Sequence, residues 1–256
     1  MSSVRHAARQ VGYENRAFWR NPAAAFFTIF LPFMFLVLFN AIFNDDSIDI
    51  EGGSVDISVF YVPGIAALSV IGACYTNIGM TVAISRDLGV LKRVRGTPLA
   101  PWAFIAGRVI HAMLLALLLV AIVIVAGAVL YDVEVPDTMP AVVVTVLIGG
   151  AAFCALGMAI TVVIPNSDSA PSIVNATVLP LLFISDVFIP LQDPPGWVDT
   201  LGDIFPIKPF AEALQASFNP YNTGNGFEWD NLAVVAAWGV FGLIVALRYF
   251  SWEPRR

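Results

Sequence analysis

The sequence predicts an all-α polytopic membrane protein with a single transmembrane domain over residues 1–256, and three observations predict it. Only 12% of the residues are charged and 58% are hydrophobic, whereas an ordinary soluble domain has about 25% charged residues. Apolar runs long enough to cross a bilayer recur along the chain. The basic and acidic residues also lie in different sets of the segments between these runs. This composition excludes a soluble domain of useful size.

The first predicted element is an amphipathic helix over residues 3–20, which we expect to lie in the membrane interface. On a wheel of about 100° per residue, its apolar side holds Val4, Ala7, Ala8, Val11, Phe18 and Trp19. The opposite side carries the arginines that would face lipid phosphates: Arg5, Arg9, Arg16 and Arg20. Asn21-Pro22 ends the helix. The pattern fits both a simple anchor and an inner-face helix that transmits motion or meets a partner.

Six apolar runs follow, and each is predicted to cross the membrane. They cover residues 23–43, 59–84, 102–130, 140–164, 172–189 and 232–249. Gly149, Gly150 and Gly157 give the fourth run a smooth face for close helix packing. Pro180 is expected to kink the fifth run.

The basic residues predict the orientation of these spans. Every Lys and Arg except Lys208 precedes the first run, lies between the second and third or just inside the third, or lies at the end of the last run or beyond it. By the positive-inside rule, both termini and the 85–99 segment are cytoplasmic. The outer loops hold the acids, so a pI of about 4.8 does not indicate a basic partner. Arginine outnumbers lysine and aspartate outnumbers glutamate, a usage typical of GC-rich prokaryotic genomes, and we therefore expect a prokaryotic plasma membrane.

Residues 85–95 are predicted to form a second, shorter amphipathic helix beneath the membrane. Its basic face would hold Arg86, Gly89, Lys92 and Arg93, and its apolar face Leu88, Val90, Leu91 and Val94. Ser85 is expected to cap the N-terminus, with Asp87 in the first turn near the positive end of the helix dipole. Gly96-Thr97-Pro98 ends it. Because short connections join this helix to two spans, a push on it would move both.

The run Arg86-Asp87-x-Gly89-x-Leu91-Lys92-Arg93-x-Arg95-x-Thr97-Pro98-Leu99 resembles the signature of the type-2 ABC (ATP-binding cassette) transporter permeases. Within them it is similar to the bacterial drug-resistance and lipid-export permeases of daunorubicin-exporter type. The resemblance covers most of the chain. It includes the basic helix ending in Asn-Pro, the six spans, Phe188-Ile189-Pro190-Leu191 and Pro206-Ile207-Lys208-Pro209-Phe210.

The resemblance implies that residues 85–99 form a coupling helix, which docks into a cleft on a separate ATPase subunit and carries its closing motion into the membrane. The residues implied are Arg86, Asp87, Gly89, Leu91, Lys92, Arg93, Arg95, Thr97 and Pro98. It also implies a re-entrant outer segment over residues 200–218, similar to the outer lid of such exporters. Two permeases, as a homodimer or a heterodimer, would form the pathway at their interface. Asp186 departs from the pattern, because the family usually has a small residue there.

The chain lacks the parts needed for ATP chemistry of its own. A phosphate-cradling loop, G-x-x-x-x-G-K-[ST], needs a lysine after glycine, and neither Lys92 nor Lys208 follows one. ATP and magnesium are therefore expected on the partner ATPase, with no cofactor bound by this chain. His6 and His111 are the only histidines and cannot build a metal site. Membrane lipids are expected as further partners, and nucleic acid is not.

A few polar residues inside the spans are candidates for a substrate path: Asn40, Asn77, Thr81, Asn175 and Asp186. Polar groups at this depth either pair between helices or line a wet path. The sequence therefore predicts the permease subunit of an ATP-driven exporter of a lipophilic or amphipathic substrate. The alternative is a stand-alone secondary transporter or lipid scramblase, for which Asp186 is the single candidate acid. A membrane-embedded enzyme lacks catalytic residues.

Overall fold

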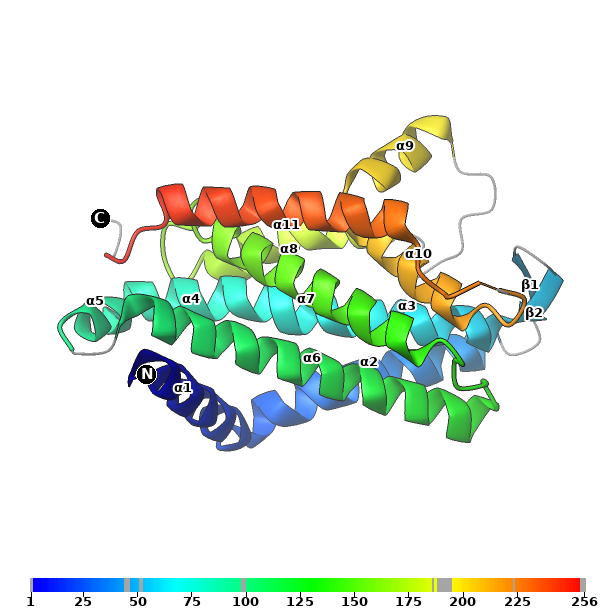
Figure 1. Ribbon diagram of the computed structural model, residues 1–256, viewed down its shortest axis with the longest axis horizontal. Helices are drawn as coiled ribbons and strands as arrows, with labels where there is room; N and C mark the ends of the chain where they lie inside the picture. The colour runs from blue at the N-terminus through cyan, green and yellow to red at the C-terminus, as the bar shows by residue number, and fades with distance from the viewer. Residues whose placement is uncertain are drawn as a thin grey trace.

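In the computed structural model, long helices run side by side along the long axis of the molecule (Figure 1). The structure describes residues 2–43, 47–50, 53–97, 100–185, 187, 195–222 and 224–253. In chain order the elements are α1 (Ser2–Trp19), α2 (Pro22–Ile42), β1 (Ser47–Ile50), β2 (Gly53–Asp56), α3 (Ile57–Ile71), the π-helix η1 (Gly72–Thr76), α4 (Asn77–Asp87), α5 (Val90–Arg95), α6 (Pro101–Tyr131), α7 (Met139–Ile160), α8 (Ala170–Phe183), α9 (Gly196–Ile204), α10 (Ile207–Phe218) and α11 (Trp229–Tyr249).

Among the described residues, five helices are long and apolar enough to cross a membrane. They are α2, the continuous helix α3–η1–α4 over Ile57–Asp87, α6, α7 and α11. This agrees with the predicted all-α membrane fold. The bounds of the first and third predicted runs differ from those of α2 and α6 by one residue at each end, because a long apolar run is a local property of the sequence.

The predicted fifth run, 172–189, requires a correction. Its helix, α8, is shorter and ends at Phe183. At about 1.5 Å per residue it reaches about 21 Å, less than the roughly 30 Å of a hydrocarbon core. Ile184 and Ser185 form a turn beyond it, and Asp186 and residues 188–194 lie outside the described residues. A sixth crossing stays a prediction.

The helix α3–η1–α4 is the centre of the bundle, since most of its surface is buried. It packs against α2 and α6 and also against α7 and α10. The predicted smooth face of α7 is present. A Cβ on Gly157 would lie 2.8 Å from the carbonyl oxygen of Tyr75, and one on Gly149 would lie 2.1 Å from the ring of Phe210. These glycines therefore allow the close approach of α7 to the central helix and to α10.

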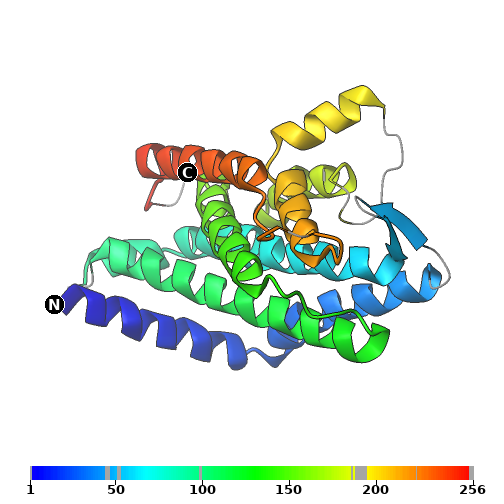
Figure 2. The same ribbon diagram turned by 45° about the vertical axis from the view of Figure 1, so that its right-hand side comes forward.

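The two ends of the molecule differ. The N-terminus of α1, helix α5 and the C-terminal end of α11 lie at one end, and the antiparallel hairpin β1–β2 lies at the other (Figure 1). Between them α10 is buried against α3, α7 and α11, whereas α9 projects from the bundle in both views (Figures 1 and 2). That the N-terminal end of α1, the C-terminal end of α11 and helix α5 share one end is compatible with the predicted cytoplasmic side, which itself stays a prediction.

Candidate functional site

The segment between the second and third spans is bent, and we call residues 85–97 the elbow. Helix α4 continues through Asp87, the chain turns at Leu88 and Gly89, and α5 then runs over Val90–Arg95. Gly89 has a φ of 68°, in the left-handed region that glycine adopts without a steric cost. The expectation of one helix over 85–95 is therefore wrong in its geometry. Ser85 does not cap a helix, because its hydroxyl donates to the Thr81 carbonyl within α4.

Arg86 lies inside the bundle and not on an exposed basic face, which corrects its predicted position. Only 1% of its surface is exposed. Its Nη1 donates to the carbonyl of Thr161 at 2.7 Å, and its Nη2 donates to the carbonyl of Ile164. Thr161 caps the C-terminus of α7, where backbone carbonyls lack helical partners and attract a cation. Because α4 continues through Asp87 and the chain turns only at Leu88 and Gly89, Arg86 lies on α4, and its side chain reaches the end of α7.

Asp87, the residue after Arg86, binds the connection that follows α7. Its Oδ2 accepts from the backbone N–H of Ser167 at 2.9 Å and from the Ser167 hydroxyl at 2.7 Å. Asp87 therefore ends α4 and does not begin a new helix, contrary to expectation. Together, Arg86 and Asp87 attach the end of the central helix to residues 161–167, the connection between α7 and α8.

Helix α5 presents the other side of the elbow. Lys92, Arg93 and Arg95 are exposed, whereas Leu91 is fully buried. Leu88, predicted on the apolar face, is 65% exposed because it lies in the turn and not on α5. The Thr97 hydroxyl donates to the Val94 carbonyl at 2.7 Å and closes the C-terminal end. Pro98 and Leu99 lie outside the described residues.

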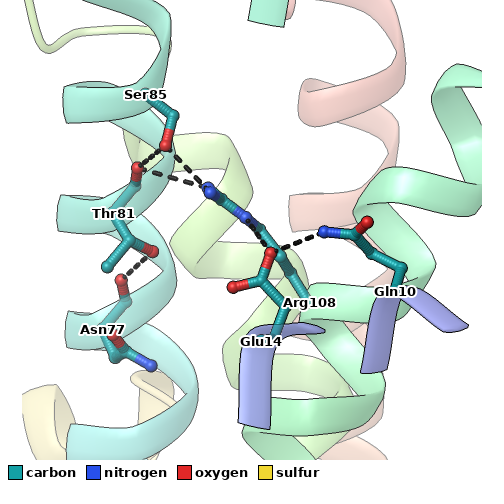
Figure 3. A network of polar contacts seen from close by, with 6 residues as sticks. All are labelled: Gln10, Glu14, Asn77, Thr81, Ser85 and Arg108. Atoms are coloured by element: carbon teal, nitrogen blue, oxygen red, sulfur yellow. Dashed lines mark hydrogen bonds and ion pairs between the residues drawn. The ribbon is translucent and has the colours of Figure 1, made fainter. Parts of the chain in front are cut away.

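A polar network joins the elbow to α1 and α6 (Figure 3). Arg108 on α6 pairs through Nε with the Glu14 carboxylate at 3.0 Å, and its Nη2 donates to the Ser85 hydroxyl at 2.9 Å. It also donates to the Thr81 carbonyl at 3.3 Å, and Gln10 donates to Glu14 at 2.9 Å. Sequence reasoning did not find Gln10 or Glu14. Two features of the sequence could have indicated this pair. Glu14 is the single acid of an arginine-rich helix, and Arg108 is a lone charge within a span.

This network changes the expected orientation of α1. Ala7 is buried and Val11 and Phe18 are partly buried toward the bundle, so part of the face assigned to lipid packs on α6. A Cβ on Gly107 of α6 would lie 2.5 Å from the Gln10 side chain, which shows how closely the two helices approach. The side chains of the predicted anchor are exposed: Arg5, Arg9, Arg16, Trp19 and Arg20. Their contact with lipid stays a prediction.

The structure does not gather the predicted path residues into one site. Asn40 is buried and donates to the Leu36 carbonyl of its own helix at 2.8 Å. Thr81 is exposed and donates to the Asn77 carbonyl at 2.7 Å, and Asn175 is exposed on α8, which packs against α4. Asp186 lies outside the described residues. A role of these residues in a path stays a prediction.

Away from the elbow, Lys208 joins α10 to α9, and Glu212 joins α10 to α11. Its side chain is buried, and its Nζ contacts the carboxylates of Asp199, of Asp203 at 2.7 Å and of Glu212 at 3.7 Å. Asn231 on α11 donates to Glu212 at 3.2 Å. Burial acts to lower the pKa of Lys208, but hydrogen bonds with Asp199 and Asp203 and the charge of Glu212 outweigh it and raise that pKa above its ordinary value. Lys208 therefore stays charged at neutral pH.

The fold and the elbow define a multi-pass helical membrane protein with a basic segment at one end of its central helix. Residues 11–219 match the sequence profile of the ABC-2 type transporter family. The chain therefore belongs to the ABC-2 type transporter family, and the resemblance that residues 86–99 indicated is confirmed.

Several relatives are named as permeases. The probable multidrug ABC transporter permease YbhR of Escherichia coli is 25% identical over 160 residues, which cover 62% of this chain and 43% of YbhR. The daunorubicin resistance ABC transporter permease protein DrrB1 of Streptomyces coeruleorubidus is 26% identical over 221 residues, which cover 84% of this chain and 74% of DrrB1. The putative transport permease ycf38 of Porphyra purpurea is 23% identical over 237 residues, which cover 91% of this chain and 79% of ycf38. The chain thus spans less than half the length of YbhR.

Proposed function

We propose that the chain is the permease subunit of an ATP-driven exporter, and that a separate ATPase subunit moves the elbow. One observation carries the proposal. Arg86 is buried and bound to the end of α7, while Lys92, Arg93 and Arg95 on the next helix are exposed. One side of the elbow is thus attached to the bundle, and the other offers positive charge to a partner with an acidic surface.

The attachments give a displacement of α5 two routes into the bundle. Arg86 and Asp87 connect it to the loop between α7 and α8. Ser85 connects it through Arg108 to Glu14 on α1. Both routes consist of charge-assisted hydrogen bonds, which are shorter and stronger than neutral ones. A push on α5 would therefore move α1, α6, α7 and α8 together.

In the proposed cycle, the ATPase subunit binds ATP and magnesium, and its closing motion switches the permease from inward to outward access. Two permeases, identical or different, would form the path at their interface. The apolar composition of the helices supports a lipophilic or amphipathic substrate, and the names of the relatives YbhR and DrrB1 support export. The pair α9–α10, held by Lys208, would serve as the re-entrant outer lid.

The proposal is tested by reversing the charge of α5. In the variant Lys92→Glu/Arg93→Glu, we expect normal membrane insertion and loss of a co-purifying protein that carries the G-x-x-x-x-G-K-[ST] motif, together with its ATP hydrolysis. The matched control is Arg16→Glu/Arg248→Glu, which makes the same charge change at exposed arginines of other helices and should keep the ATPase bound. Retention of the ATPase by the α5 variant would refute the proposal.

A further inference from the structure

A groove of about 270 Å³ lies in the side of the bundle. Its walls come from the central helix, α7, α8, α11 and the turn between α9 and α10. The deep wall includes Ile71, Tyr75, Phe153 and Ile207, all of which are buried. Tyr75 belongs to the π-helix η1, and such irregular turns within helices are frequent at functional sites.

The polar side chains among the described lining residues are already hydrogen-bonded to the protein. The Tyr75 and Thr177 hydroxyls are 2.6 Å apart, and Thr177 also donates to the Val174 carbonyl. The Trp238 indole N–H donates to the Ile204 carbonyl at 2.7 Å. A ligand with polar groups would lose its water and find no new partner here, whereas a hydrocarbon loses nothing. The groove therefore favours a purely apolar occupant.

The rim of the groove opens onto the surface that meets the bilayer. Val163, just beyond α7, and Phe241 on α11 are exposed rim residues. Helices α7 and α11 are both candidate membrane spans. The exposed apolar face of α11 continues beside the rim through Val240, Ile244 and Leu247. The medium at this opening is lipid, so the apolar molecule available at high concentration is an acyl chain.

We propose that this groove binds one acyl chain of a membrane phospholipid, which enters past Val163 and Phe241 and ends against Tyr75. The bound chain would also contact Phe205, Pro206 and Ile207, where α9 turns into α10, and would support that turn against α7. The inference does not depend on coupling to an ATPase.

The test is photolabelling of the purified full-length chain in vesicles of phosphatidylethanolamine and phosphatidylglycerol. A trace phosphatidylcholine carries a diazirine in its acyl chain, and labelled residues are mapped by mass spectrometry. Tyr75 is only 9% exposed and lies behind the rim, whereas Leu247 on α11 is 80% exposed and reports on surrounding lipid. We expect label at both residues of the native chain.

Two substitutions fill the groove from different walls, Ala159→Trp from α7 and Leu181→Trp from α8. Each should reduce the Tyr75 label by about tenfold, the effect of a tenfold weaker association, and leave the Leu247 label unchanged. The control Val240→Trp adds the same side chain to the lipid face of α11 outside the groove, and should leave the Tyr75 label intact. Absence of Tyr75 label in the native chain, a Tyr75 label in both groove-filling variants as strong as in the native chain, or crosslinking of Tyr75 to a second copy would overturn the proposal.

Discussion

Arg86 carries a charge into an apolar bundle, and it is stable there because the end of α7 supplies acceptors. The same contact satisfies carbonyls that no helical N–H reaches. The contact thus gives the buried guanidinium its acceptors and gives the carbonyls at the end of α7 a donor. This explains why an arginine, with its planar fork of donors, suits the position better than a lysine with one flexible ammonium.

Replacing Arg86 by methionine is expected to destabilise the protein. The carbonyls of Thr161 and Ile164 would lose a charged donor in a buried place, at a cost of about 3 kcal/mol. The melting temperature in detergent should fall by several degrees. Lys92→Met removes a charge from the exposed face of α5 and serves as the control, with no expected change. Equal melting temperatures of the two variants would contradict the structural role assigned to Arg86.

At the scale of elements, five of the six predicted runs match helices long enough to cross a membrane, whereas the fifth run and the elbow were predicted poorly. A span is a local apolar run, so its bounds can be read directly. The elbow depends on contacts between distant residues, because Arg86 binds a carbonyl 75 positions away and Arg108 pairs with Glu14 across 94. A helical wheel over 85–95 assumes one straight axis. That assumption failed at Gly89, although glycine in a polar segment was itself a signal for a turn.

The bend can be tested by comparing two glycines that both have open space around them. An added Cβ meets nothing within 4 Å at Gly89 or at Gly12, but only Gly89 has a positive φ. Gly89→Ala should destabilise the protein by about 1 kcal/mol, the cost of a left-handed L-residue. Gly12→Ala lies in α1 and should stabilise it by up to about 1 kcal/mol. Thermal unfolding of both variants measures the difference, and the same sign for both would contradict a bend that needs glycine.

At the scale of the whole molecule, the central helix links all the features described above. Its 31 residues extend about 46 Å, from the hairpin end past the groove at Tyr75 to the elbow at Arg86. Most of its surface is packed against neighbours, and a well-packed interior transmits displacement instead of absorbing it. The groove and the pair α9–α10 touch the same helices as the elbow, so the two ends of the molecule are joined mechanically through a shared core.

Helix α9 can be released from α10 while the buried helices of the core stay packed. Lys208→Met removes the cation that three carboxylates share, and their mutual repulsion should separate α9 from α10. We expect faster hydrogen exchange over α9 (Gly196–Ile204) and unchanged exchange over α10 and α5, whereas Lys208→Arg should keep the native pattern. Because α9 contacts mainly α10, its release leaves the spans packed. Unchanged exchange over α9 in the methionine variant would show that apolar contacts alone, and not Lys208, hold α9 against α10.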